Sequence, residues 1–180
     1  MLLTIGHGAD TADGFAARCS RNAVARIVDV RTAPGSRLHP QFGRTEMERW
    51  LPEAGVAYRG ERALGGFRKP LPDSLNGGLQ HPSFRGYADY MSASEFHAAL
   101  AAVLLEAATS TTAVMCSETL WWRCHRRLIA DAATLLHGVE VVHIDGRGGT
   151  EPHRVTGEAR VIDGVLRYPA VTDARLLEGR

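Results

Sequence analysis

The chain has 180 residues, the length of one ordinary domain, and folding should bury about 70% of the surface of the unfolded chain. Hydrophobic residues make up 44% of the chain and charged residues 23%, which excludes a disordered, collagen-like or coiled-coil protein. The 21 basic and 20 acidic side chains leave a formal net charge of +1. This small charge excludes an overall electrostatic footprint on nucleic acid, so any such footprint must be local.

Three features of the sequence indicate the cellular compartment of the protein: its first residues, its apolar runs and its cysteines. The longest apolar run, Ala98–Leu105, is far too short to cross a bilayer, so we expect no membrane association. Met1–Gly6 has neither a basic region nor a long apolar stretch, and we therefore expect no signal peptide and a cytoplasmic location. Three cysteines without an export signal predict free thiols rather than a disulfide framework.

Short apolar segments alternate with segments of helical periodicity along most of the chain. In chain order we expect a strand at Leu2–Ile5, a helix at Thr11–Arg21, a strand at Ala25–Val30, a helix opened by the capping box Thr45–Glu48 and stopped by Gly55, a strand at Val56–Tyr58, a helix from Ser94 to Ala108, a strand at Thr112–Met115, a helix from Cys124 to His137, and a strand at Glu140–Ile144. The alternation predicts an α/β fold: a three-layer sandwich with a mainly parallel central sheet covered on both faces. All these strands except Val56–Tyr58 should be adjacent in the middle of the sheet.

Two stretches depart from this alternation. Residues 59–82 have no periodicity and predict a long loop, which in a compact domain is usually functional or mobile. Near the end, Asp163-Gly164 separates Ala159–Ile162 from Val165–Tyr168, a pattern typical of a β-hairpin with a two-residue turn. We therefore divide the chain into an α/β domain, 1–144, and a C-terminal extension, 145–180, whose hairpin packs on the same domain and is a candidate edge of its sheet.

Polar side chains follow the expected strands at the points where the strands end. In open α/β sheets, ligands bind outside the carboxyl ends of the strands, so these side chains are candidates for a site. Structural interpretations remain open, since a histidine after a strand is often only a hydrogen-bonded structural residue, and Asp29 with Arg31 can be a simple ion pair. We expect one cleft to be lined by His7, Asp29, Arg31, Cys116, Glu118 and Arg126.

The segment 115–127 holds the strongest candidate for reactivity. It places Cys116 at a strand end and Cys124 at the expected start of a helix, near several arginines and His125. Free backbone N–H groups and positive charge favour a thiolate, so the pKa of Cys124 should be depressed, and Cys124 should react faster than Cys19. The alternative is that both are buried small hydrophobic residues.

Spacing excludes several familiar thiol sites. A phosphatase-like Cys-x5-Arg loop is absent because the required positions hold Trp122 and Ala130, and there is no Cys-x-x-Cys pair. A zinc site would use Cys116, Cys124 and His125, but adjacent cysteine and histidine ligands rarely converge on one ion. We therefore expect no metal and no cofactor.

Two features favour nucleic acid. Trp121-Trp122 lies in an arginine-bearing loop and resembles a platform for stacking a base, although covering the helix start is the simpler interpretation. Residues 31–69 carry a surplus of four positive charges, which would hold phosphate or simply form a solvated face.

Ordered motifs across Leu2–Ile144 resemble the DUF488 family of unknown function. The motifs are Thr4-Ile5-Gly6-His7, Asp29-Val30-Arg31, Pro34-x-Ser36, Leu64-Gly65-Gly66, the segment Phe84–Met91, and Cys116-x-Glu118 followed by Cys124-His125-Arg126. The resemblance implies a small bacterial or archaeal α/β protein whose motif residues gather in one cleft, but it implies no settled reaction. The sequence departs from the family pattern at Trp121-Trp122 and in the hairpin after Ile144, which leaves the substrate open.

Two hypotheses follow. The first is an enzyme acting on a small anionic, phosphate-bearing or nucleotide-like molecule. Arg31, Arg37 and Arg126 would hold the anion, with Tyr87 and His125 as further ligand-binding residues; Cys124 or Cys116 would attack, and Glu118, His7 and Asp29 would be acid/base candidates. The second is a nucleic-acid-binding module, for example in DNA repair, that uses no thiol chemistry; a steep dependence of binding on salt would distinguish it. The sequence leaves open whether the chain is an enzyme and gives no expectation for its oligomeric state.

Overall fold

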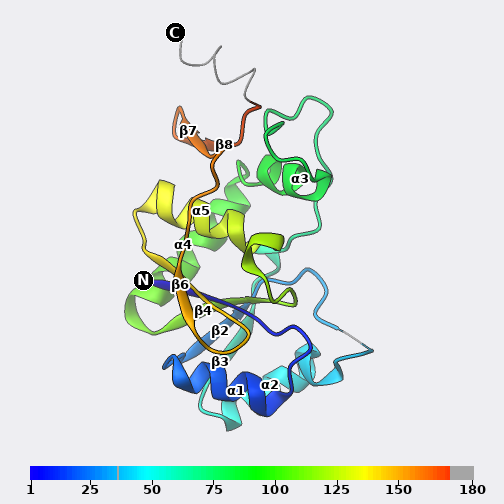
Figure 1. The fold of residues 1–180 in the computed structure, drawn as a ribbon, viewed down its shortest axis with the longest axis vertical. Coiled ribbons are helices and arrows are strands. Elements are labelled where there is room, and N and C mark those ends of the chain that lie inside the picture. Colours follow the sequence, from blue (N-terminus) through cyan, green and yellow to red (C-terminus); the bar gives the residue numbers. More distant parts are fainter. Residues whose placement is uncertain (36, 171–180) are drawn as a thin grey trace.

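The computed structural model describes residues 1–35 and 37–170 and has the predicted α/β architecture (Figure 1). Ser36, part of one motif above, and the last ten residues of the C-terminal extension lie outside the described residues. Within the described part of the chain, no helix combines the length and the apolar character needed to span a membrane.

The central sheet contains six strands in the described residues, in the order β3-β2-β4-β1-β5-β6. The strands are β1 (Leu2–Gly6), β2 (Arg26–Asp29), β3 (Ala57–Gly60), β4 (Thr112–Cys116), β5 (Val141–Ile144) and β6 (Thr150–Pro152). All neighbours are parallel except β5 and β6, so the prediction of a mainly parallel sheet with β2, β4, β1 and β5 adjacent is confirmed. Every residue of β1 and β4 is buried, as expected for strands covered on both faces.

Helices cover both faces of this sheet, which confirms the three layers (Figure 1). On one face, α1 (Ala12–Arg21) and α2 (Arg44–Glu53) bury Phe15 and Leu51 against the sheet. On the other, α4 (Ser94–Thr109) and α5 (Arg126–His137) bury Phe96 and Leu128. Another helix, α3 (Pro82–Tyr90), was not predicted and joins this second core through Tyr87.

Several predicted helix boundaries were wrong. Thr45 lies inside α2, whose N-cap is Gly43, so the expected capping box does not form. Ser94 is the first residue of α4 rather than its cap. The last helix begins at Arg126, not at Cys124, because a 3₁₀ turn at Trp121–Arg123 closes first: the Cys124 N–H donates to the Trp121 carbonyl at 3.1 Å, and Cys124 has an extended backbone.

The long loop is confirmed over residues 65–81, which contain no helix or strand. Before it, β3 extends to Gly60 and a 3₁₀ turn spans Arg62–Leu64; a further 3₁₀ turn spans Pro40–Phe42. The Asp89 carboxylate holds the loop by accepting hydrogen bonds from the Leu71 N–H, the Ser74 hydroxyl and the Asn76 amide. The Asp89 side chain on α3 thus stabilises the loop in place of the backbone hydrogen bonds that a helix or strand would provide.

The predicted hairpin forms from β7 (Arg160–Ile162) and β8 (Val165–Arg167). Asp163 and Gly164 have φ values of 50° and 77°, the left-handed conformations of a type I′ turn. The hairpin is a separate two-stranded sheet, so its suggested place at the edge of the main sheet was wrong. The short strand β6, which the sequence did not indicate, occupies that edge instead.

A buried carboxylate on α5 connects the C-terminal extension to the rest of the fold. Asp131 is fully buried and accepts hydrogen bonds from the Thr156 N–H (2.9 Å), His153 Nε2 (3.0 Å) and the Tyr168 hydroxyl (2.9 Å). His153 Nδ1 in turn lies 2.9 Å from Nε2 of His143, on β5. The extension is therefore joined to the sheet by buried hydrogen bonds as well as by apolar packing.

We predict that Asp131→Ala lowers the free energy of unfolding by about 3 kcal/mol or more, because it leaves several buried donors without an acceptor. Urea denaturation monitored by circular dichroism measures the change. Asp163→Asn is the matched control, since asparagine tolerates the left-handed conformation of the exposed turn. Equal stabilities for the two variants would contradict this account of how the extension is held.

Candidate functional site

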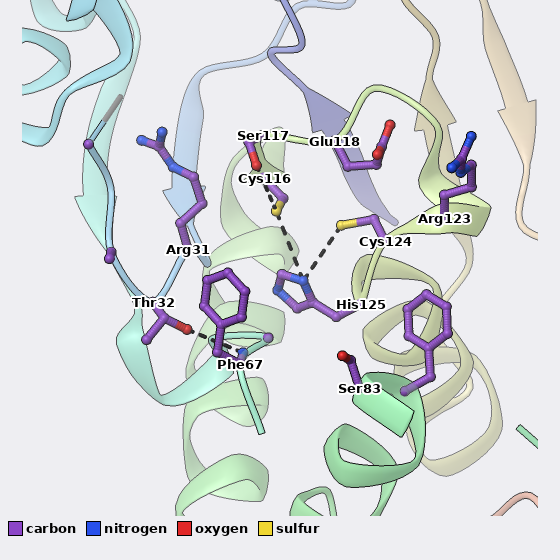
Figure 2. Close-up of a pocket in the computed structure, with 14 residues that line it drawn as sticks. Arg31, Thr32, Phe67, Ser83, Cys116, Ser117, Glu118, Arg123, Cys124 and His125 are labelled. Carbon is purple, nitrogen blue, oxygen red and sulfur yellow. Dashed lines mark hydrogen bonds between the residues drawn. The ribbon is translucent and has the colours of Figure 1, made fainter. Parts of the chain in front are cut away.

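A cavity of about 380 Å³ opens at the carboxyl ends of β2 and β4 (Figure 2). Its walls come from the segments after these strands, from the long loop, from the start of α3 and from the turn that leads into α5. The lining residues are Arg31, Thr32, Ala33, Gly35, Gly66, Phe67, Ser83, Phe84, Cys116, Ser117, Glu118, Arg123, Cys124 and His125.

Strand register explains why the two central segments meet here. β2 and β4 are adjacent and parallel, with Asp29 paired to Met115, and the Val30 N–H donates to the Met115 carbonyl at 3.0 Å. One residue further along each strand, Val30 and Cys116 therefore lie side by side at the end of the sheet, and Arg31 directly follows Val30. The strand-end rule thus selected a real opening in the fold.

His125 has a defined orientation and tautomer. Its Nε2 lies 3.2 Å from the Val30 carbonyl, which can only accept, so Nε2 carries the proton of the neutral ring. Nδ1 is then an unprotonated acceptor, and it faces Cys116 Sγ at 3.9 Å and Cys124 Sγ at 3.6 Å (Figure 2). The site therefore presents two sulfur atoms and one nitrogen lone pair to a common point.

Two close neighbours hold the ring of His125. Tyr87 packs edge-on against it, with ring centroids 5.1 Å apart, and is itself anchored by a hydrogen bond to the Leu64 carbonyl. Gly66 approaches so closely that a Cβ atom there would lie 2.6 Å from Nδ1. The glycine of the Leu64-Gly65-Gly66 motif is thus required by the position of this histidine.

Arg126 supplies the positive charge beside Cys124. Its side chain is fully buried, and its Nε donates to Cys124 Sγ at 3.4 Å. Nη2 donates to the Glu118 carbonyl, while Nη1 has no hydrogen-bond partner. Among the described residues, Arg126 forms no ion pair with a carboxylate. An arginine cannot lose its proton in a protein, so an anionic Cys124 is the counter-charge that this geometry provides.

The two thiols have opposite pKa shifts. A hydrogen bond from Cys116 lowers the pKa of Cys124 to about 6; burial opposes this effect, and Arg126 adds to it through its charge, its side chain and its backbone N–H. The same hydrogen bond, together with burial, raises the pKa of Cys116 to about 12. At neutral pH, Cys124 is therefore the thiolate and Cys116 keeps its proton. The lowered pKa of Cys124 agrees with the direction predicted from the sequence; its largest single cause is the hydrogen bond from Cys116, and Arg126 is the arginine that adds to it.

Arg31 lines the cavity, but its guanidinium is tied into a buried cluster. Its guanidinium binds the Asp29 carboxylate in a bidentate pair, at 2.8 and 2.6 Å, and Asp29 also accepts from the Tyr58 hydroxyl. Arg31 Nη1 lies 3.1 Å from His7 Nε2, which must accept, so His7 Nδ1 donates to the Gly8 carbonyl. Burial and Arg31 lower the pKa of His7 to about 4, so His7 is neutral at pH 7. Both ring nitrogens of His7 are occupied.

The residues selected from sequence fall into two groups. Arg31, Cys116, Glu118, Cys124 and His125 line the cavity, although Glu118 uses one carboxylate oxygen to accept from the Leu120 N–H and the Arg31 guanidinium points away from His125 (Figure 2). The others are not among the lining residues: His7, Asp29, Tyr87 and Arg126 are buried behind the walls, and Arg37 is exposed.

Sequence reasoning missed part of the lining. Phe67, Ser83, Phe84 and Arg123 were not selected as site residues, yet each contributes to the cavity. Phe67 lies in the long loop, and Arg123 directly precedes Cys124. The aperiodic loop was the sequence signal that could have identified Phe67. Ser83 and Phe84 reach the cavity because they lie on α3, a helix that the sequence pattern did not indicate.

The tryptophan pair does not form a stacking platform. Trp121 is buried and stacks on His143 with ring centroids 4.0 Å apart, and its indole N–H donates to Glu151. Trp122 is exposed, and its ring is perpendicular to that of Trp121. The simpler interpretation, a side chain that covers the turn before α5, describes Trp121 well.

The sequence argument against a metal assumed that adjacent Cys124 and His125 do not converge with Cys116. That assumption was wrong: the two sulfur atoms and a histidine nitrogen all lie within 4.8 Å of one another. The extended backbone of Cys124, followed by a helical turn at His125, brings both side chains to the same point.

A family model described as "Domain of unknown function DUF488" matches residues 11–133. The match includes Cys116, Cys124 and His125, and it confirms the resemblance drawn from the motifs. No curated protein and no solved structure matches the chain.

We predict that alkylation of Cys124 by iodoacetamide follows a titration with a midpoint near pH 6, because the thiolate is the reactive form. Cys19, whose pKa burial raises to about 12, should remain unlabelled near neutral pH. Arg126→Gln should raise the midpoint by about one unit or more, since a nearby cation favours the charged form. Peptide mass spectrometry identifies the labelled cysteine.

Arg127→Gln is the matched control for Arg126→Gln, because the neighbouring arginine lies over the Phe84 ring. If Arg126→Gln does not fold, Cys116→Ala supplies the same test, since it removes the hydrogen bond that contributes most to the shift. A midpoint near pH 9 in the unaltered protein would contradict the assignment of Cys124 as the thiolate.

We also predict that Gly66→Ala destabilises the protein by about 1–3 kcal/mol, because the added methyl group collides with the His125 ring. Gly157→Ala is the control, since a Cβ atom there meets nothing within 4 Å. Urea denaturation measures the free energy of unfolding of both variants. A neutral Gly66→Ala would show that the ring is not held as described.

Proposed function

We propose a function for this chain, which belongs to the DUF488 family: its cavity binds a small anionic molecule, and Cys124 attacks that molecule as a thiolate nucleophile. The observation that carries the proposal is the placement of Cys124 in the cavity wall, with its sulfur accepting a hydrogen bond from a buried arginine. Thiolates stabilised in this way are typical of reactive rather than structural cysteines.

The neighbours of Cys124 support a covalent reaction. The thiolate sulfur would form a bond to an electrophilic centre, and the leaving group would depart with the electrons of the bond that breaks. His125 Nδ1, an unprotonated acceptor 3.6 Å from the sulfur, would then take a proton from the water that displaces the bound group and restores the thiolate. Cys116 would hold the thiolate in place through its hydrogen bond.

Arg123 supports an anionic ligand. It is exposed, lines the cavity and directly precedes Cys124, so its guanidinium is available to hold a carboxylate or phosphate. Arg31 is a different case, because its guanidinium is engaged by Asp29, His7 and the Phe42 carbonyl. We therefore assign ligand binding first to Arg123, and we assign Arg31, Asp29 and His7 to positioning the wall.

The shape and chemistry of the cavity favour a small molecule over a polymer. Its volume of about 380 Å³ is at the lower end of the usual range for ligand pockets. Phe67 and Phe84 give it apolar surface, and Ser83, Ser117 and Glu118 give it polar groups. A compact ligand with one flat or apolar part and one anionic group fits this combination.

The nucleic-acid hypothesis has less support. Within the described structure, three of the eight basic side chains in residues 31–69 form ion pairs: Arg31 with Asp29, Arg49 with Glu46, and Arg59 with Glu61 and Glu106. Asp29 and Glu106 lie outside this segment, so they offset part of its surplus of positive charge. Trp121 is buried against His143 instead of presenting a stacking face. The described residues thus offer less free charge and aromatic surface than the sequence suggested.

Two alkylating reagents of similar size test the proposal. Iodoacetate is anionic and iodoacetamide is neutral, and each forms a bond from sulfur to carbon as iodide leaves. We predict that Cys124 prefers iodoacetate relative to a free thiol such as glutathione. Arg123→Ala should lower this preference about fivefold, as expected for the loss of one partly screened charge.

Arg154→Ala, an exposed arginine of the C-terminal extension, is the matched control and should leave the preference unchanged. Peptide mass spectrometry again locates the modification. Modification of Cys116 in place of Cys124 would refute the assignment of the nucleophile. A preference equal to that of glutathione, and unaffected by Arg123→Ala, would refute the anionic ligand.

A further inference from the structure

We infer that Cys116, Cys124 and His125 bind one tetrahedral transition-metal ion of the zinc type. The inference goes beyond the proposed function, because it assigns a metal to the site and not a role in the thiolate reaction. It rests on the convergence of three soft ligand atoms, two sulfur and one nitrogen, at the wall of the cavity.

The spacing of the ligand atoms fits such an ion. Zinc binds cysteine sulfur at about 2.3 Å and histidine nitrogen at about 2.0–2.1 Å, so tetrahedral geometry places sulfur and nitrogen about 3.6 Å apart. The observed separations from His125 Nδ1 are 3.6 Å to Cys124 Sγ and 3.9 Å to Cys116 Sγ. These two separations would change by only a few tenths of an ångström. The two sulfur atoms lie within 4.8 Å of each other and would sit about 3.8 Å apart around the ion.

The lone pair of His125 already has the orientation that a metal needs. A ligating histidine usually donates its other ring N–H to a carbonyl or carboxylate, which fixes the tautomer. Here Nε2 donates to the Val30 carbonyl, and Nδ1 faces the sulfur atoms. Arg126 Nε donates to Cys124 Sγ, a contact that a metal-bound thiolate retains.

Ligand type and charge select the ion. Two thiolates and an imidazole favour zinc and related soft or borderline ions over magnesium or calcium, which prefer oxygen. A divalent ion neutralises the two thiolates, and binding releases the proton that Cys116 otherwise holds. The neutral centre would lie beside the buried charge of Arg126.

The site has an open side. Three protein ligands leave the fourth tetrahedral position for water or another small ligand, an arrangement typical of catalytic rather than structural zinc. All three ligand residues line the cavity, so an incoming molecule would reach this position from it. Metal and electrophile would compete for the same lone pair of Cys124. The metal-bound chain and the chain with a free nucleophile are therefore separate states.

Cobalt(II) is a direct probe. The full chain, purified with a chelator and a non-thiol reductant, is titrated with Co²⁺ and followed by absorption. We expect one Co²⁺ per chain, intense visible bands of tetrahedral cobalt and near-ultraviolet sulfur-to-cobalt charge transfer, with Zn²⁺ displacing the cobalt. Cys116→Ser and His125→Gln should each weaken binding on the order of a hundredfold. Cys19→Ala, in the core on the opposite face of the sheet, should bind normally.

The outcomes separate this inference from the proposed function. Absence of charge-transfer bands, or bands that persist in the Cys116→Ser/Cys124→Ser double variant, would overturn the metal site. If the ligand variants do not fold, protection in the unaltered protein decides: Zn²⁺ should block alkylation of Cys124, and undiminished alkylation would overturn the site. Alkylation of Cys124 in the metal-free protein tests the nucleophile alone, so either idea can fail while the other stands.

Discussion

The hydrogen bond from His125 Nε2 to the Val30 carbonyl sets the chemistry of the cavity. It joins residues 95 positions apart in the chain and connects the start of α5 to the end of β2. Because a carbonyl only accepts, this contact places the ring proton on Nε2 and directs the Nδ1 lone pair to both sulfur atoms. Without it, His125 could adopt either tautomer, and neither proton transfer nor metal binding would have a defined acceptor.

The surrounding fold protects this arrangement. The parallel pairing of β2 and β4 brings Val30 and Cys116 to the same edge of the sheet. The Asp29–Arg31 pair fixes the chain that follows β2, and Gly66 leaves room for the ring. Asp29 does not line the cavity, and its place in a motif is explained because it restrains Arg31, which does.

The sequence predicted the layers well because apolar periodicity reports burial directly: β1, β4 and the helices α1, α4 and α5 each follow from it. It failed where a tertiary contact decides the outcome. The turn at Trp121–Arg123 delays α5, and Pro152 forms an edge strand only because β5 lies beside it. For the site, strand ends identified Arg31 and Cys116, but sequence spacing alone suggested that Cys124 and His125 diverge. A polar residue such as His7 either lines the cavity or supports its wall, depending on the hydrogen-bond partners of its side chain. The spacing of residues in the sequence does not identify those partners.

Charge balance explains why Cys124, and not Cys116, is the thiolate. Arg126 is fully buried, cannot lose its proton and has no carboxylate partner among the described residues. A buried charge of this kind is costly unless an opposite charge lies beside it, and the Cys124 sulfur is the group to which its Nε donates. Cys116 Sγ contacts Ser117 Oγ and His125 Nδ1, and its hydrogen bond to Cys124, together with burial, disfavours its anion. With a divalent metal the balance would differ, because the ion and the two thiolates form a neutral centre; Arg126 would keep its hydrogen bond to the Cys124 sulfur but face no net opposite charge. The buried arginine thus favours an anionic sulfur at Cys124 most strongly in the metal-free protein.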